Sequence, residues 1–177
     1  MKTFNLNFSI IKAFKNLKRD KTVNVVLKNH ENKYVLGAKP QYYPKGIYRL
    51  LGGGVDSGES VQKAAVREIR EEIGVDLSPG TIEHIGTLDV SARDSVGKNY
   101  STIIELVFIN TQISDYKISD EIGGFIELDE QEFTEMIKRY ENLSNGLSPD
   151  MNWGDYGKVY AEVHRIALEL TKDKRLN

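Results

Sequence analysis

The most informative absence in this chain is that of cysteine, since its 177 residues contain none. Without cysteine there is no disulfide framework, no thiol nucleophile and no zinc site of the cysteine type. No run of about 18 apolar residues is present, so a membrane-spanning helix is not expected. The basic N-terminal stretch also lacks the apolar segment of a signal peptide, and a cytoplasmic location is therefore expected.

The chain also has no large excess of positive or negative charge. The formal net charge is −2 at pH 7, which argues against general nucleic-acid binding and against binding to membrane surfaces. A chain of 177 residues can bury a proper core, and a single domain over 1–177 is expected.

The segment 53–75 carries the densest pattern in the sequence, GGVDSGESVQKAAVREIREEIGV. Between Ser60 and Ile73 there is neither glycine nor proline, and strong helix formers dominate, so a helix is predicted. Ser60 is a suitable N-cap, and Gly74 suits the left-handed residue that ends a helix.

Three glutamates gather on this predicted helix. At about 100° per residue, Glu68, Glu71 and Glu72 fall within an arc of about 100° beside an apolar stripe. Packed like charges raise one another's pKa unless a cation lies among them, and Mg2+ or Mn2+ is the natural occupant. Arg67, one turn before Glu71, can pair with that carboxylate. A glutamate-rich helix by itself, however, is more often a solvated face.

A glycine-rich turn just before the helix changes that balance. Gly52, Gly53 and Gly54 let the backbone approach a phosphate or a metal closely, and the helix N-terminus favours anions. Turn and helix together therefore predict one site that binds metal and phosphate.

The full pattern G-x5-E-x7-R-E-U-x-E-E-x-G-U, with U an aliphatic residue, begins at Gly53 and resembles the signature of the Nudix hydrolases. Members of that family cleave diphosphate linkages in nucleotide-type substrates with divalent metal. The resemblance implies an α+β chain with the Nudix fold, an α/β/α sandwich containing a mixed β-sheet. It also implies a core at about 20–142, with a short N-terminal extension and a C-terminal helix.

The resemblance further implies roles for single residues. A backbone carbonyl near the first motif glycine, at Gly52 or Gly53, often adds a metal ligand, and Glu59 is expected to brace the loop against the helix. The metal ligands assigned on this basis are Gly53, Glu68, Glu71 and Glu72.

The general base is left open, because some members use a motif glutamate and others a later loop residue. Glu121 is the candidate for a base or a fourth metal ligand, with a solvated loop acid as the alternative. Glu105 lies in an apolar strand and can point into the cleft, although a solvent-facing edge is slightly favoured. The catalytic candidates are Arg67, Glu68, Glu71, Glu72 and Glu121.

Substrate recognition has several candidates near the glycine turn. Lys39 and Arg49 approach the turn in sequence and can meet phosphate oxygens, although ordinary surface charge is the commoner role. Around 91–93 there is neither the proline typical of ADP-ribose hydrolases nor the tyrosine typical of dinucleoside polyphosphate hydrolases. The assigned substrate-binding residues are Lys39, Arg49, Gly53 and Gly54.

Hydrophobic patterning predicts a mixed order of elements outside the motif. A first strand is expected at Phe4–Ile10, and a hairpin at Val23–Leu27 and Tyr34–Leu36. Further strands are predicted at 81–90, 100–110 and 124–128, and helices at about 129–141 and 156–172.

Three functions compete on this basis. The first is a metal-dependent hydrolase that cleaves a diphosphate linkage in a nucleoside di- or triphosphate, or in a nucleoside-diphosphate-linked substrate, by attack of water at phosphorus. The alternative is a non-catalytic nucleotide-binding sensor, but degenerate regulators usually lose motif carboxylates. The Nudix-like isopentenyl diphosphate isomerases rely on a cysteine, which this chain lacks.

Many family members are dimers, so a homodimer is left open, as is closure of the 142–155 loop over the site.

Overall fold

The computed structural model describes residues 2–38, 44, 46–113, 116–117, 123–146 and 151–175. Within these ranges the main sheet has the strand order β1-β4-β5-β2. Its strands are β1 (Lys2–Ser9), β2 (Lys21–Val26), β4 (Ile82–Arg93) and β5 (Asn99–Ile109). β1 pairs with β4 and β2 with β5 in parallel, whereas β4 and β5 are antiparallel, so the sheet is mixed, as expected.

A smaller antiparallel sheet joins β3 (Tyr34–Ala38) to β6 (Gly124–Leu128). The helices are α1 (Val61–Ile73), α2 (Glu130–Glu141) and α3 (Trp153–Thr171), with short 3-10 turns η1 (Lys15–Lys18) and η2 (Pro79–Thr81). Among the described residues, no helix is both long enough and apolar enough to cross a membrane.

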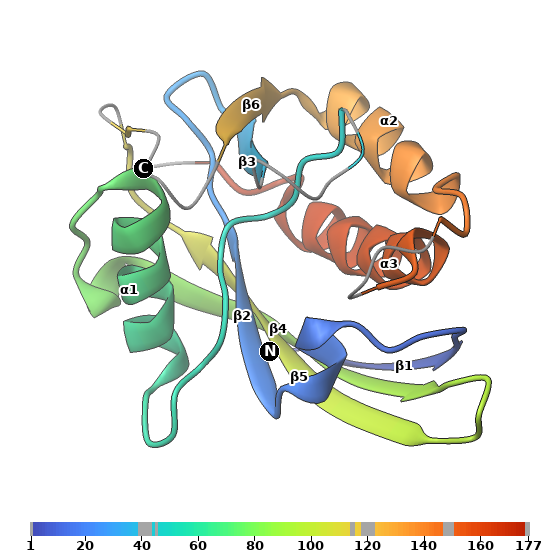
Figure 1. The fold of residues 1–177 in the computed structure, drawn as a ribbon. Helices are drawn as coiled ribbons and strands as arrows, with labels where there is room; N and C mark the ends of the chain where they lie inside the picture. Colours follow the sequence, from blue (N-terminus) through green and yellow to red (C-terminus); the bar gives the residue numbers. More distant parts are fainter. Residues whose placement is uncertain are drawn as a thin grey trace.

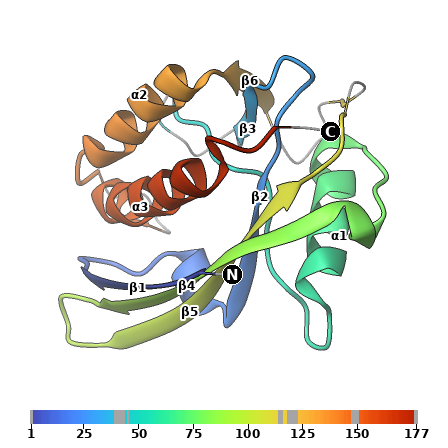
Figure 2. The same ribbon diagram turned by 180° about the vertical axis from the view of Figure 1, so that it is seen from behind.

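Helices lie on both faces of the main sheet. Successive side chains of a strand point to opposite faces, and β5 shows this alternation clearly. Leu106 and Phe108 join the cluster that contains α2 and α3, whereas Val107 and Ile109 join the cluster that contains α1. Figures 1 and 2 show α1 on one side and α2 with α3 on the other. The expected α+β class and mixed sheet are confirmed.

The helix predicted between Ser60 and Ile73 is confirmed together with its two ends. The Ser60 side chain accepts a hydrogen bond from the backbone N–H of Lys63, and Gly74 adopts a left-handed conformation with φ of 69°. Buried positions of α1 face the sheet, and they include the two carboxyl residues Glu68 and Glu72. The turn of the motif is therefore attached to a helix whose inner face carries acids.

The expected hairpin at Val23–Leu27 and Tyr34–Leu36 is only partly present. The backbone N–H of Val35 donates to Leu27, but β2 takes β5 as its strand partner and β3 takes β6. Long-range pairing thus separates two neighbouring strands into different sheets, which local alternation does not reveal.

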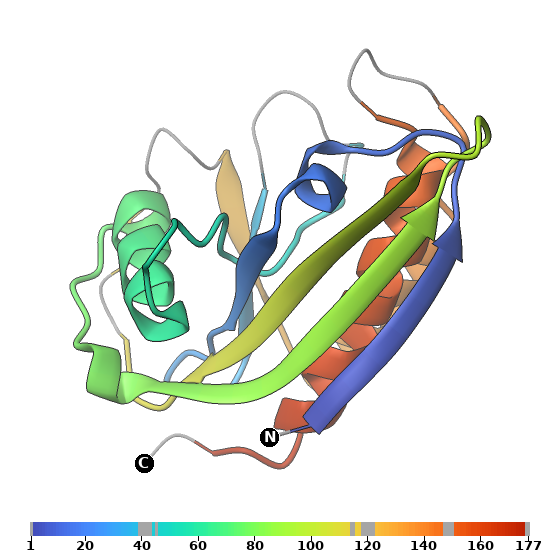
Figure 3. The ribbon, with the colours of Figure 1, turned by 90° about the horizontal axis from the view of Figure 1, so that it is seen from below.

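The N-terminal segment is fixed to the last helix. Asp155, near the start of α3, accepts hydrogen bonds at one carboxylate oxygen from the backbone N–H groups of Ile11 (2.7 Å) and Lys12 (2.9 Å). Phe14 is buried and packs edge-on against Tyr156, with ring centroids 5.2 Å apart. In Figure 3, β1 lies at the edge of the sheet beside β4, with α3 behind it. These contacts place η1 just before β2 and next to the glycine turn.

Candidate active site

Glu72 joins α1 to the glycine turn. Its side chain is 1% exposed, and Oε2 accepts the backbone N–H of Gly52 at 2.8 Å. The other oxygen, Oε1, lies 3.4 Å from Nη2 of Arg49, which itself is largely buried. Arg49 was expected to meet substrate phosphates, but here its guanidinium lies against a carboxylate of the motif.

Either the Gly52 or the Gly53 carbonyl was expected to bind the metal, and these two carbonyls point in different directions. The Gly53 carbonyl accepts the backbone N–H of Val23 at 2.9 Å, and so belongs to the pairing with β2. The Gly52 carbonyl lies 3.4 Å from Nη2 of Arg49, on the side of Glu72. The Gly52 carbonyl and Glu72 Oε1 thus lie at the same nitrogen of Arg49.

Glu68 lies against the backbone of Gly53. A Cβ placed on Gly53 would come within 2.4 Å of Glu68 Oε2, so the absence of a side chain makes room for this carboxylate. Burial raises the pKa of Glu68, and hydrogen bonding from Arg67 opposes that rise. The carboxylate consequently occupies a space that any larger residue at position 53 would fill.

Arg67 is the organising cation of the site. Its Nη2 donates to the Gly54 carbonyl at 2.8 Å and to Glu59 at 3.0 Å, while Nη1 donates to Glu68 at 2.8 Å and to Glu71 at 3.3 Å. The hydrogen bond to Arg67 lowers the pKa of Glu59 and raises that of the guanidinium. The expected pairing with Glu71 is present, as is the expected bracing of the loop by Glu59.

Carboxylate and carbonyl oxygens dominate this turn, and they are the hard donors that Mg2+ and Mn2+ prefer. Within the parts of the chain that the structure describes, no three acidic or histidine side chains converge as a ready-made metal site. Instead Glu72 is held by Gly52 and Arg49, and Glu68 and Glu71 by Arg67. The donor chemistry fits a hard divalent cation, whose entry would exchange some of these contacts.

Two assigned residues, Lys39 and Glu121, lie outside the described residues. Glu105 is described, and the slight preference for a solvent-facing edge was wrong. Its side chain is 6% exposed and lies 2.9 Å from His84 Nε2, 2.7 Å from the Thr87 hydroxyl and 3.2 Å from Lys21 Nζ. The alternation of an apolar strand did not reveal these polar partners.

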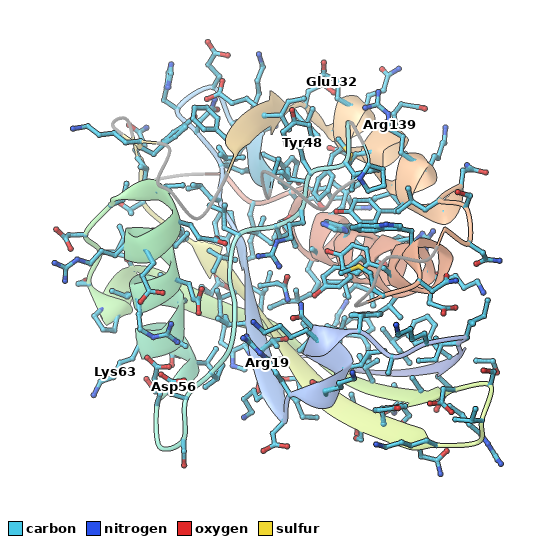
Figure 4. The ribbon with its side chains drawn as sticks, viewed as in Figure 1. Arg19, Tyr48, Asp56, Lys63, Glu132 and Arg139 are labelled. Atoms are coloured by element: carbon cyan, nitrogen blue, oxygen red, sulfur yellow. The ribbon has the colours of Figure 1, made fainter. Side chains whose placement is uncertain are left out.

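A cavity of about 430 Å³ opens beside the turn and reaches Arg67 and Glu68. Its lining residues are Lys18, Arg19, Asp20, Lys21, Gly54, Val55, Asp56, Arg67 and Glu68. In Figure 4, Arg19 lies beside β2 and Asp56 in the loop that leads to α1. The sequence interpretation missed the segment 18–21, because nothing in its local pattern links it to a motif that begins at Gly53.

Comparison with known proteins identifies the family of the chain. The model of the NUDIX domain matches residues 18–141. Similar chains include the NAD-capped RNA hydrolase NudC of Pseudomonas aeruginosa (strain LESB58), 40% identical over 63 residues, which are 36% of this chain and 22% of that protein. The first relatives are thus matched over only about a fifth of their length.

A longer match is to the ADP-ribose pyrophosphatase of Methanocaldococcus jannaschii. That protein is 32% identical over 124 residues, covering 66% of this chain and 70% of the relative. Among solved structures, the MutT protein of Methanosarcina mazei Go1 is similar, with a TM-score of 0.54 and 17% identity over 89% of this chain and 99% of the other. At that identity the structural likeness concerns the fold.

Proposed function

The chain belongs to the NUDIX domain family, and we propose that it is a metal-dependent hydrolase that cleaves a diphosphate linkage by attack of water at phosphorus. The substrate class is a nucleoside di- or triphosphate, or a nucleoside-diphosphate-linked molecule. The observation that carries the proposal is the approach of two buried carboxylates, Glu68 and Glu72, to the backbone of Gly53 and Gly52. A cytoplasmic location and a small nucleotide-type substrate belong to the same proposal.

Mg2+ or Mn2+ is proposed to be held by Glu68, Glu71 and Glu72. We assign the carbonyl ligand to Gly52 in place of Gly53, because the Gly53 carbonyl is already bonded to Val23. The bound cation would neutralise charge on phosphate oxygens and lower the pKa of the attacking water.

The remaining residues of the turn have positioning roles in this proposal. Arg67 holds the carboxylates of Glu68 and Glu71 through one nitrogen, Nη1, and the turn itself through the Gly54 carbonyl. Arg49 and the Gly52 amide hold Glu72 in a buried position. Glu121 remains the proposed base or fourth ligand, and Lys39 a proposed phosphate contact.

The activities named for two relatives guide the choice of substrates to test. One is an NAD-capped RNA hydrolase and the other an ADP-ribose pyrophosphatase, and NAD and ADP-ribose each contain a diphosphate that joins two larger groups. The sequence lacks the marker proline of ADP-ribose hydrolases near 91–93, so nucleoside di- and triphosphates belong in the same panel.

The proposal is tested by a hydrolysis screen with Mg2+ or Mn2+. Nucleoside triphosphates, damaged nucleotides, nucleotide sugars, ADP-ribose, NAD and dinucleoside polyphosphates are incubated with the protein, and the products are separated by chromatography. Glu72→Gln serves as the blank, because it keeps the shape of the side chain and an acceptor for the Gly52 amide. Hydrolysis that is absent from the blank supports the enzyme. Silence over the panel, with nucleotide binding retained, would favour the non-catalytic sensor.

A further inference from the structure

We propose that Arg19, together with Lys18, forms a subsite for a terminal phosphate group of the substrate in the cavity beside Glu68. The identity of that ligand as part of the substrate rests on the proposed function. The binding of a phosphate dianion by these two cations is an independent claim about the cavity.

The guanidinium of Arg19 lies directly on the glycine turn. A Cβ placed on Gly54 would come within 2.7 Å of Arg19 Nη1, so this glycine makes room for Arg19 just as Gly53 makes room for Glu68. Two neighbouring glycines therefore admit a guanidinium and a carboxylate to adjacent stretches of backbone. A ligand bound at the carboxylate side through a metal would lie within the same cavity as Arg19.

Arg19 and Lys18 are the cations of the cavity that remain available. No residue that the structure describes forms a hydrogen bond or an ion pair with either side chain, although Arg19 is half-buried. By contrast, Lys21 pairs with Glu105 at 3.2 Å. Arg67 likewise forms ion pairs with Glu59 and Glu68. A half-buried guanidinium that pairs with no acid among the described residues is a natural site for an oxyanion, since its planar fork matches phosphate oxygens.

The acids of the cavity do not cancel this charge at the turn. Asp56 is 80% exposed and lies at 4.0 Å from Arg67, and Asp20 is also exposed. Glu68 is the third acid, and the proposed function assigns it to the cation. A terminal phosphate carries about −1.5 to −2 charge at pH 7, which two available cations can match, whereas a phosphate inside a capped diphosphate carries about one charge.

The segment that bears these cations is fixed at both ends. Before it, Leu17 is buried and Asn16 hydrogen-bonds through its side chain to the hydroxyl of Tyr160 on α3. After it, the carbonyl of Asp20 accepts the backbone N–H of Ile103 at 3.0 Å. Lys18 and Arg19 are thus presented by a segment that is held in place before a ligand arrives, which lowers the entropic cost of binding.

The test measures the affinity of the full chain for imidodiphosphate, a non-hydrolysable diphosphate, by titration calorimetry in Mg2+ and separately in EDTA. Arg19→Gln should weaken binding about tenfold to a hundredfold under both conditions, as expected for loss of a charge-assisted contact. Arg19→Lys should retain part of the affinity, because it keeps the charge but loses the fork.

The matched control is Arg139→Gln. Arg139 lies on α2, well away from Arg19 in Figure 4, and its Nη1 donates to the Gly46 carbonyl at 3.4 Å. Its variant should bind imidodiphosphate like the wild type. The proposal is overturned if Arg19→Gln binds within about twofold of the wild type, if Arg139→Gln loses as much, or if the wild type does not bind. Unchanged circular dichroism of Arg19→Gln excludes unfolding as the cause of a loss.

A second pair of probes tests the assignment to a terminal phosphate. The α,β-methylene analogue of ADP should lose the same factor in Arg19→Gln, while the corresponding analogue of ADP-ribose should lose much less. Equal losses would overturn that assignment. If imidodiphosphate binding in EDTA depends on Arg19 but no substrate of the panel is hydrolysed, the proposed function is contradicted and the phosphate subsite is supported. If a substrate is hydrolysed but imidodiphosphate binding does not depend on Arg19, the proposed function is supported and the subsite is contradicted.

Discussion

Glu72 on α1 accepts the backbone N–H of Gly52 at 2.8 Å, and through this bond the acidic helix and the glycine turn form one unit. Gly52 and Glu72 are separated in the sequence by the rest of the turn and most of α1, and the hydrogen bond between them is buried. Any change that moves Gly52 therefore also moves a proposed metal ligand.

Gly52→Ala should strongly destabilise the fold. Gly52 has φ of 127°, which side-chain-bearing residues rarely adopt, and a Cβ there would lie 2.2 Å from the Val23 carbonyl oxygen. A loss of at least about 2 kcal/mol in the free energy of unfolding is expected from strain and clash together. Urea denaturation measures it. Gly80→Ala, whose Cβ would meet only the Ser78 side chain at 3.7 Å, is the control and should change little.

Mg2+ or Mn2+ should raise the thermal stability of the wild type. Binding to the folded state alone adds about 2.7 kcal/mol when the free metal is at a hundred times its Kd. Glu72→Gln should lose most of this gain, because an amide is a poorer ligand than a carboxylate. Tm is measured with and without metal at constant ionic strength. Glu83→Gln, an exposed acid paired with Lys174, should respond like the wild type; an equal gain in Glu72→Gln would remove that residue from the ligand set.

Arg67→Lys should lower kcat by about tenfold or more with a smaller change in KM. An ammonium cannot reproduce the fork that reaches Glu59, Glu68 and the Gly54 carbonyl at once. Steady-state kinetics on the substrate found in the screen provide the measurement. The same substitution at Arg70, which is exposed on α1 and paired with Asp76, should leave kcat unchanged. Equal kcat values for the two variants would contradict a positioning role for Arg67.

His164 should make the protein less stable in mild acid. It is fully buried, its Nε2 accepts the backbone N–H of Leu50, and burial lowers its pKa to about 4 from 6.5. Since the unfolded chain takes up the proton first, this stability is fully present above pH 6.5 and is lost as the pH falls towards 4.

The expected loss from His164 between pH 7 and pH 5 is about 2 kcal/mol in the free energy of unfolding. Urea denaturation at both pH values measures it. His164→Gln removes the titrating group, so its own stability should fall by correspondingly less over the same interval. The assignment fails if the two proteins show the same pH dependence.

Asp155→Asn should loosen the N-terminal segment. The buried carboxylate accepts the backbone N–H groups of Ile11 and Lys12, and hydrogen bonds to a charged acceptor are worth about 1.5–3 kcal/mol each. Amide hydrogen exchange at those two residues should accelerate, while exchange in α1 stays as in the wild type. Asp76→Asn, an exposed acid, should leave both regions unchanged. Unaltered protection at Ile11 and Lys12 would show that other contacts hold the segment.

The features that the sequence predicted well are those fixed by local pattern. The helix that ends at Gly74 follows from its cap residues and from the absence of breakers, and the Arg67–Glu71 pair follows from helical spacing. The bracing of the turn by Glu59 was implied by the family motif. Such contacts depend on residues that are close in sequence or on a spacing that the helix imposes.

The features that were missed depend on tertiary contacts. The contact of Arg49 with Glu72 joins the residues before the glycine turn to α1 and was not predicted, while a contact of Arg49 with substrate phosphate stays a prediction. Glu105 is buried because Lys21, His84 and Thr87 come to it from other strands. Whether a polar side chain in an apolar strand is solvated is decided by those distant partners, which alternation alone does not specify.

Asp155 connects two segments that both lie outside the family match at 18–141, since Ile11 and Lys12 precede that range and α3 follows it. Loss of either segment would remove the Asp155 hydrogen bonds and the contact between the rings of Phe14 and Tyr156. The N-terminal segment and α3 should therefore have been retained or lost together during evolution. Among homologous chains, we expect a long leading segment to occur with a long last helix, and a substitution at one side of the Asp155 contact to be accompanied by change at the other.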